Sequence, residues 1–477
     1  MAKYPEYDSE TLQRELAGVI PAETISSNML ERINNALDCF TPEVNKDTLP
    51  YLVVMPNSAE EVSSLMKFAN ARKIPVFPRG SGTGHTGAVA YNYKGIVLNT
   101  VKMNHVNIYP EYGYFECGPG CRVIDVTNEL SKQGYFLPIV PGSRKVASMG
   151  GIIVNNTSGH IVDSCIGKPR DYVLGLETIL PTGEILETGT KSLRKPAGTD
   201  LGNYFIGGDG LLGVVTNIRM RLLPAMQNAY SVAFFEKTED AARAVQEGYW
   251  GKTPPPVFWE FLDQESAAIG CRIQGLDPPV GHVLLAHFIG QTREETSAKV
   301  DSLHRIYRNL KPLKMEKIED LEYWEKIWRV REVMLPYLLQ DTAGVGFKGA
   351  EVVSTIPDLV DCMKACVDFS KGMPTLEKVH GYVLGHLGAL TLHLAYIFPK
   401  EMSDADKIKA MDEVSVREAE INLRFGTCPG EWGQFSRFRN SFYLARYGRK
   451  NYQLVKDIKK LFDPNDILNP GVLLDDF

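Results

Sequence analysis

The chain has 477 residues, 44% of them hydrophobic, and carries a formal net charge of −6. Such a length exceeds one ordinary domain, so two or three domains with cores of their own are expected. The acidic balance and the lack of any run of basic residues exclude a surface built for nucleic acids. The sequence shows no apolar signal segment and no run of about 18 apolar residues, which predicts a cytoplasmic protein without a transmembrane segment.

The N-terminal part of the chain alternates helical and strand patterns. Residues 9–41 have the amphipathic spacing of helices, and residues 51–55 have the composition of a strand. A helix is predicted to begin after Ser58, which is a favourable N-cap residue. Residues 76–78 and 95–98 are predicted to be short strands on either side of a glycine-rich loop. This order predicts an α+β domain with long loops that hold a cofactor.

The loop that follows residues 76–78 combines glycine with one arginine. Glycine lets the backbone approach a ligand closely and lets N–H groups converge on an anion. The spacing does not fit the Rossmann fingerprint, and no Gly-Lys-Ser/Thr sequence closes a P-loop. A tight surface turn is the alternative, but the full string favours a large phosphorylated cofactor. The residues concerned are Pro78, Arg79, Gly80, Ser81, Gly82, Thr83, Gly84 and His85.

A second glycine-rich piece occupies residues 148–159, and the chain ends in a third at residues 462–471. Between them the composition shifts near Pro224, after which strand and helix patterns alternate again over roughly 200 residues. This alternation predicts a second domain, an α/β sandwich. The expected segments are a helical segment at 1–42, a first domain at 43–224, a second domain at 225–414, and a C-terminal segment at 415–477 that returns to the first domain.

Taken in order, these pieces resemble the flavoproteins of the vanillyl-alcohol oxidase/p-cresol methylhydroxylase superfamily. Residues 170–183 and 206–216 are similar to the stretches "RDNVLGLEVVLPDG" and "GSEGTLGVIT" of its glycolate oxidase/D-lactate dehydrogenase branch. The resemblance covers roughly residues 43–224 and 370–477. It implies an α+β fold of two domains, in which a p-cresol methylhydroxylase-type domain binds FAD and an α/β cap domain binds the substrate.

The resemblance also implies which residues contact FAD. Besides the first loop, these are Pro141, Gly142, Ser148, Gly150, Gly151, Asn155, Ser158 and Gly159, with Gly213, Val214 and Val215 at the adenine end and Asn469 over the flavin. Covalent members of the superfamily carry a histidine in a "GxGHS" loop, bonded to the flavin 8α-methyl group, and His85 stands in a similar string. The branch itself usually has leucine there and binds FAD non-covalently. A covalent tether and a histidine that only lines the flavin therefore both remain open.

A metal site is implied by residues near the end of the predicted cap domain. His386 and His393 resemble the branch's "GHxGDGNLH" motif, and Glu431 resembles the glutamate of its "GEHGIG" motif. Two imidazoles and one carboxylate suit Zn²⁺, Mn²⁺ or Fe²⁺ with positions open for a chelating substrate. The chain departs from the pattern at residues 389–391, which are apolar or neutral, and at Trp432, which replaces the histidine expected as general base. A strand with two buried histidines is the alternative.

One further catalytic candidate, Arg331, follows from the same resemblance, and two more are considered as replacements for the lost base. Arg331 is similar to the arginine of a "WxxRE" motif that grips the substrate carboxylate, because a guanidinium matches a carboxylate bidentately. An exposed helical arginine is the alternative. His380 and Tyr443 are candidates for the base that is lost at Trp432.

These residues predict an FAD-dependent enzyme that oxidises the CH–OH group of a 2-hydroxy acid, one with a bulky apolar or aromatic side chain, by hydride transfer to flavin N5. The alternatives are a metal-independent oxidase or dehydrogenase of aromatic alcohols or alkylphenols, a non-redox enzyme of the alkyl-glycerone-phosphate synthase type, and a subunit that only passes electrons on. A metal assay separates the first alternative from the main prediction.

The eight cysteines form no CxxC pair, cluster motif or haem-attachment motif, so reduced thiols are expected. Flavin is then the only electron carrier that the chain holds. The electron acceptor would be oxygen, a quinone, an electron-transfer flavoprotein or a separate iron–sulfur subunit. A homodimer is also left open.

Overall fold

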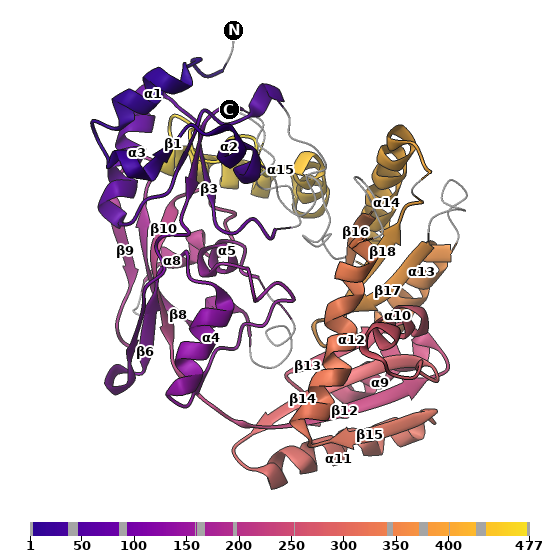
Figure 1. The fold of residues 1–477 in the computed structure, drawn as a ribbon. Helices are drawn as coiled ribbons and strands as arrows, with labels where there is room; N and C mark the ends of the chain where they lie inside the picture. The colour runs from indigo at the N-terminus through magenta and orange to yellow at the C-terminus, as the bar shows by residue number, and fades with distance from the viewer. Residues whose placement is uncertain are drawn as a thin grey trace. The chain divides into compact units, whose positions relative to one another are not determined.

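The structure is a computed structural model in which the chain forms two compact units (Figure 1). Unit 1 consists of the described residues within 1–159, 168–225 and 435–477, and unit 2 of those within 160–167 and 226–434. The residues that the structure describes are 3–36, 46–84, 93–157, 159, 167–193, 198–251, 253–340, 347–371, 380–399, 401–425 and 436–474.

Unit 1 contains a four-stranded sheet in the order β1-β2-β4-β3, in which β2, β4 and β3 run parallel and β1 pairs antiparallel to β2. Its strands are β1 (Ile25–Ser26), β2 (Leu52–Val54), β3 (Val76–Arg79) and β4 (Ile96–Asn99), and the helices of this region are α1 (Ser9–Leu16), η1 (Ala22–Thr24), α2 (Met29–Asn35), η2 (Lys46–Thr48) and α3 (Ala59–Arg72).

The helix α3 forms as its sequence predicts. The Ser58 hydroxyl accepts a hydrogen bond from the backbone N–H of Glu61 at 3.3 Å, which satisfies one of the unpaired N–H groups at the helix start. Its apolar face, which includes Val62, Leu65 and Met66, is fully buried in the core beneath the four-stranded sheet. Burial of such side chains stabilises the fold by about 1.5–3 kcal/mol each. The core of unit 1 therefore supports the strand from which the first glycine loop leaves.

A second sheet of unit 1 is antiparallel, in the order β5-β6-β10-β8-β9, and a short ribbon pairs β11 with β7. The strands are β5 (Val106–Tyr109), β6 (Tyr114–Cys117), β7 (Tyr135–Phe136), β8 (Val173–Ile179), β9 (Ile185–Gly189), β10 (Val214–Arg221) and β11 (Leu223–Pro224). The helices are η3 (Pro110–Tyr112), α4 (Val123–Lys132), α5 (Met149–Val154), α7 (Pro169–Tyr172), α8 (Gly202–Phe205) and α15 (Ser436–Phe462), the last kinked at Gly448.

Unit 2 is built on a seven-stranded antiparallel sheet in the order β15-β12-β14-β13-β17-β18-β16. Its strands are β12 (Gln227–Phe235), β13 (Phe258–Leu262), β14 (His282–Gly290), β15 (Lys314–Ile318), β16 (Phe347–Val353), β17 (His380–Gly385) and β18 (Thr391–Ile397). Its helices are α9 (Thr238–Trp250), α10 (Gln264–Gln274), α11 (Arg293–Asn309), α12 (Leu321–Gln340), α13 (Leu359–Lys371), η5 (Leu387–Ala389) and α14 (Asp404–Arg424).

Helices cover this sheet on both faces. Successive side chains of β13 point to opposite faces, so both sets are buried under helices. Trp259 points to the face covered by α11, where its indole N–H donates to the Tyr307 hydroxyl at 2.9 Å. Phe258 points to the opposite face, where its ring lies 5.1 Å from that of Trp328 in α12. Glu260, two residues after Phe258, lies on the α12 face as well.

The edge strand β16 is covered by α14. The side chains of Glu418 and Asn422 accept hydrogen bonds from the backbone N–H groups of Glu351 and Val353, both at 2.9 Å. Covering an edge in this way removes unpaired groups that could recruit another strand.

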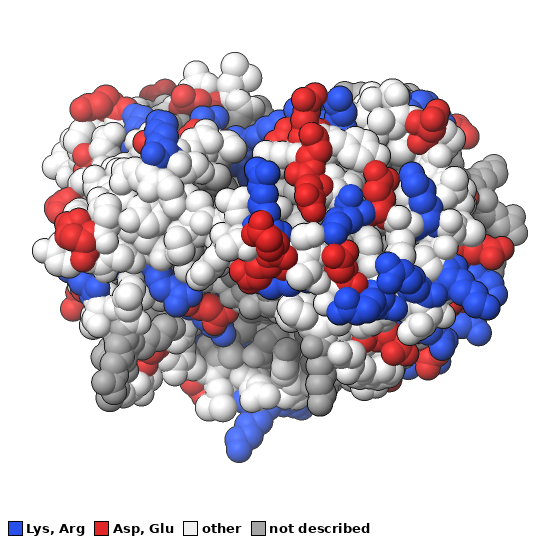
Figure 2. Space-filling model, turned by 90° about the horizontal axis from the view of Figure 1, so that it is seen from below, with Lys and Arg blue, Asp and Glu red and all other residues white. Residues whose placement is uncertain are grey.

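Charges of both signs are interspersed over the face of the molecule drawn in Figure 2, rather than gathered into one basic patch. None of the helices in the described ranges is both long and apolar enough to cross a membrane.

Candidate cofactor and substrate sites

The first glycine loop leaves β3 at Arg79 and lies against Ser148. A side chain at Gly80 would place its Cβ 2.0 Å from the Ser148 Oγ, and Gly82 has a φ of +71°, which favours glycine. The backbone N–H of Ser81 donates to the Ser148 hydroxyl at 3.4 Å. The glycines are therefore required by the path of the loop, which brings the first two glycine-rich pieces together.

Polar atoms around this loop support a charged ligand. Arg79 Nη1, Ser81 Oγ and Asn469 Oδ1 are buried and have no hydrogen-bond partner among the described residues. A buried polar group left without a partner costs about 1–3 kcal/mol, so such groups cluster where a ligand completes them. The guanidinium and hydroxyl donors suit a pyrophosphate, and the residues present therefore fit FAD.

The C-terminal piece lies beside β3. The backbone N–H of Asn469 donates to the Val76 carbonyl at 2.9 Å, and that of Val76 donates to the Ile467 carbonyl at 2.7 Å. The side-chain amide of Asn469 donates to the carbonyls of Asp209 at 3.0 Å and Gly210 at 3.4 Å. Asn469 thus links the C-terminal piece to β3, which precedes the first glycine loop, and to the loop before β10.

The same loop also contacts the second glycine-rich piece. The N–H groups of Gly207 and Asp209 donate to the carbonyls of Ile153 and Val154 in α5, at 3.1 and 2.9 Å. The structure therefore brings the sequence pieces that resembled an FAD site into one network within unit 1.

The remaining predicted FAD contacts differ in what their side chains can do. Gly150 packs closely on Pro119, and Gly213 packs on Thr178, so both serve close backbone packing. The side chain of Val214 belongs to the hydrophobic core, so only its backbone could contact a ligand. Pro141 and Val215 are buried, Gly142 is exposed, Gly151, Asn155 and Gly159 are half-buried, as are Pro78, Thr83 and Gly84, while His85 and Ser158 lie outside the described residues.

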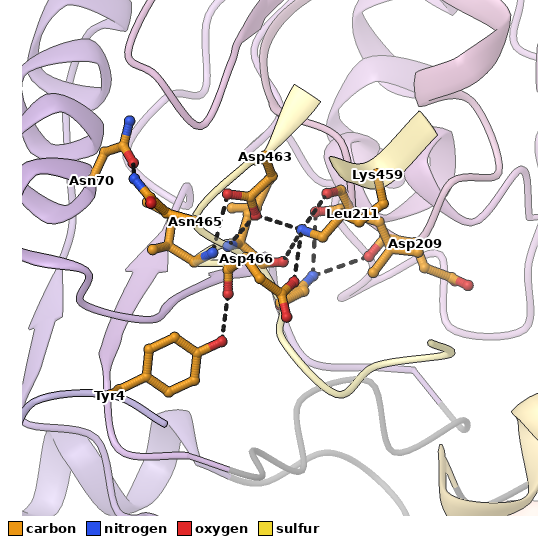
Figure 3. Close-up of polar contacts among 12 residues, drawn as sticks. Tyr4, Asn70, Asp209, Leu211, Lys459, Asp463, Asn465 and Asp466 are labelled. Carbon is orange, nitrogen blue, oxygen red and sulfur yellow. Dashed lines mark hydrogen bonds and ion pairs between the residues drawn. The ribbon is translucent and has the colours of Figure 1, made fainter. Parts of the chain in front are cut away.

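A buried lysine that the sequence analysis missed holds the C-terminal piece in place (Figure 3). Lys459 in α15 is 1% exposed, and burial lowers its pKa. Its ammonium group donates to the carbonyls of Leu211 at 2.9 Å and Leu468 at 2.6 Å and to the Asp463 carboxylate at 2.5 Å. Asp463 in turn accepts hydrogen bonds from the backbone N–H groups of Ile467 and Leu468. The Lys459–Asp463 pair therefore links the residues just before Asn469 to the loop of Leu211, which Asn469 also contacts.

In unit 2, a second buried charge lies between two of the predicted site residues. Glu260 in β13 is 0% exposed, and its two oxygens accept hydrogen bonds from Arg331 Nε and from His386 Nδ1, the latter at 2.6 Å. The strand register explains the second contact. Phe261 pairs with Gly385 across β13 and β17, so the next antiparallel pair places Glu260 opposite His386.

Arg331 reaches Glu260 because it lies on the inward stripe of α12. Trp324 and Trp328 precede it at helical spacing, and Trp324 stacks on Tyr230 with the ring centroids 4.1 Å apart. The Arg331 side chain is 12% exposed, so it is not the exposed helical arginine of the alternative interpretation. Its contact with Glu260 uses Nε, and the two Nη atoms meet no hydrogen-bond acceptor among the described residues.

The two predicted metal-ligating histidines lie side by side. The ring centroids of His386 and His393 are 5.0 Å apart at an interplanar angle of 85°. Within the described ranges no group of three His, Cys, Asp or Glu side chains is arranged to hold a metal ion, and Glu431 lies outside those ranges. The metal site therefore stays a prediction.

The two predicted alternatives for the general base belong to different units. Tyr443 lies in α15 of unit 1, with its ring 4.8 Å from that of Tyr447. His380 begins β17 of unit 2, but its side chain is not among those described, and Trp432 lies outside the described residues. Glu260, which the prediction missed, carried one signal in the sequence, as the only charged residue in an apolar strand.

Comparisons with known proteins agree with this arrangement. Residues 50–189 match the family described as FAD binding domain, and residues 225–473 match the C-terminal domain of FAD linked oxidases. The chain is 28% identical to the D-lactate dehydrogenase of Archaeoglobus fulgidus over 88% of this chain and 90% of that one. It is 27% identical to the glycolate oxidase subunit GlcD of Bacillus subtilis over 97% of this chain and 96% of that one.

Solved structures show the same two-domain fold. p-Cresol methylhydroxylase superposes with a TM-score of 0.79 at 16% identity, covering 99% of this chain and 98% of that one. An alkyldihydroxyacetonephosphate synthase superposes with a TM-score of 0.71 at 19% identity, covering 98% of this chain and 86% of that one. The predicted α+β fold, with its p-cresol methylhydroxylase-type FAD-binding domain, is thereby confirmed.

Proposed function

Because the chain belongs to the FAD-linked oxidases and is an FAD-dependent oxidoreductase, we propose that it oxidises the CH–OH group of a 2-hydroxy acid to a 2-oxo acid. In this reaction the carbinol carbon loses a hydride, the hydroxyl loses a proton, and a carbonyl forms. FAD, when bound, accepts the hydride. Arg79, Ser81 and Asn469 would hold it through the buried polar atoms described above.

The observation that carries the proposal is the Arg331 guanidinium, which is only 12% exposed and shares the Glu260 carboxylate with His386. A guanidinium held by Nε still presents its two Nη atoms, which match the two oxygens of a carboxylate. The substrates in the names of two relatives, D-lactate and glycolate, are both 2-hydroxy acids. Arg331 would therefore bind and orient the substrate carboxylate.

The substrate side chain would be bulky and apolar or aromatic. Ala389 and Leu390 are both half-buried between the two histidines, at the positions where the related motif carries aspartate and glycine. An apolar pocket favours a substrate with a larger apolar side chain, by about 1–3 kcal/mol for each methylene group that it accommodates.

The test is reduction of the FAD-loaded protein by substrate without oxygen. The visible absorption of the oxidised flavin should bleach on addition of a D-2-hydroxy acid, faster with a large apolar side chain than with lactate. Bleaching by an alkylphenol or an aromatic alcohol without a carboxylate, and not by any 2-hydroxy acid, would replace this proposal with the metal-independent alternative. A protein that no alcohol reduces would support a non-redox use of flavin.

A divalent cation would assist this reaction. His386, His393 and Glu431 are ligands that suit Zn²⁺, Mn²⁺ or Fe²⁺, and such an ion lowers the pKa of a bound hydroxyl group. The adjacent rings of His386 and His393 support the proposal.

Purified protein should accordingly contain about one such ion per chain. Activity should fall in proportion to the metal that a chelator removes, while the flavin stays bound, and His386→Ala should lower metal content. Full activity in metal-free protein would exclude the cation. His282→Ala offers a control in the same unit, because His282 is not one of the proposed ligands.

A further inference from the structure

Glu260 combines a charge and complete burial without being one of the groups that would touch substrate. Its carboxylate lies in the middle of the sheet of unit 2, with 0% of the side chain exposed. A buried carboxylate is costly unless every oxygen is hydrogen-bonded, and replacing it by an apolar residue is often neutral or favourable for stability. Its presence therefore calls for a role other than stability.

The hydrogen bonds of Glu260 determine the proton position on His386. Arg331 has donors only, so Glu260 accepts from its Nε and the pair remains ionic. A carboxylate can only accept, so the 2.6 Å contact with His386 requires a proton on Nδ1. In the neutral ring the lone pair then lies on Nε2, the atom on the side of the ring away from the buried carboxylate.

From this geometry we infer that Glu260 is a positioning residue, which orients Arg331 through one oxygen and holds His386 in the tautomer with its lone pair on Nε2 through the other. The inference rests on the proposed function and extends it to a residue of β13. It concerns which nitrogen carries the proton of the neutral ring and involves no change in net charge. An Nε2 lone pair is what either a bound cation or a substrate hydroxyl proton requires of this histidine.

Glutamine at this position separates positioning from packing. In Glu260→Gln the amide oxygen must accept from Arg331, since an arginine cannot accept, and the NH₂ group must then face His386 and donate to Nδ1. The shape is kept, but the ring is driven to the opposite tautomer, with its proton on Nε2. Glu260→Asp keeps an acceptor-only carboxylate but shortens the side chain by one methylene group.

A positioning role and a space-filling role of Glu260 predict opposite orders of activity for Glu260→Gln and Glu260→Asp. If Glu260 positions, kcat of Glu260→Gln should fall about 10–100-fold with KM changed by less than about threefold, and Glu260→Asp should be the more active of the two. If Glu260 only fills space, Glu260→Gln should match the wild type and Glu260→Asp should be worse, and that result would overturn the inference. Glu325→Gln, an exposed change on α12, is the matched control.

A second measurement does not depend on turnover. Protein labelled with ¹⁵N in its histidines should show one ring protonated at Nδ1 whose signal is absent from His386→Gln, and the proton should move to Nε2 in Glu260→Gln. An Nε2–H tautomer of His386 in the wild type would contradict the inference even if the enzyme is active. If instead no 2-hydroxy acid reduces the wild-type flavin, the proposed function fails while this proton position is still measured.

Discussion

Arg331→Ala should lower kcat/KM for a 2-hydroxy acid by about 30–5000-fold, which corresponds to the roughly 2–5 kcal/mol lost with a desolvated, charge-assisted carboxylate contact. The size of the effect follows from burial. The guanidinium is 12% exposed and already held by Glu260, so it is oriented before substrate arrives. Arg331→Lys should recover little, because an ammonium group lacks the fork that contacts Glu260 and a carboxylate at once.

Arg329→Ala is the matched control for this prediction, since Arg329 is exposed on the same helix. Both variants should be compared at equal FAD content, because removing Arg331 also leaves Glu260 without its cationic partner and destabilises unit 2. A loss below about threefold in folded, FAD-loaded protein would show that Arg331 does not bind substrate. Loss against every substrate, including one without a carboxylate, would indicate a structural rather than a binding role.

Lys459→Met should lower the free energy of unfolding by about 3–5 kcal/mol, as expected when one partner of a buried ion pair is removed. Methionine approximates the length of lysine, so the loss reflects charge and hydrogen bonding rather than volume. The Asp463 carboxylate would remain fully buried without its cation, and the carbonyls of Leu211 and Leu468 would lose their donor. Urea unfolding followed by circular dichroism measures the change.

The same variant should also release FAD more readily, because Leu211 and Leu468 border the two segments that position Asn469. Lys460→Met is the control, as Lys460 is exposed in the next position of α15. A loss of stability below about 1 kcal/mol in Lys459→Met would contradict the assignment of this pair as the clamp of the C-terminal piece. Normal FAD retention despite a large loss of stability would confine the role of the pair to folding.

The glycine-rich pieces could be identified from the sequence because their chemistry is local. Strand, turn and glycine positions within a few residues of one another predicted the cofactor loops, and a serine N-cap predicted α3. The same local pattern supported the FAD-binding assignment, which the family comparison confirmed. The metal site, the covalent link through His85 and the roles of Trp432, His380 and Tyr443 stay predictions.

Only the tertiary structure shows the interactions of two buried charged residues, Glu260 and Lys459. Glu260 is separated from Arg331 by 71 residues and from His386 by 126 residues, so only strand register and the inward stripe of α12 bring them together. Lys459 stands beside exposed Lys460, and no local pattern shows which of the two is buried. Hydrophobic periodicity reports the face of an element, whereas a buried ion pair depends on which other element covers that face, and that pairing is set by long-range packing.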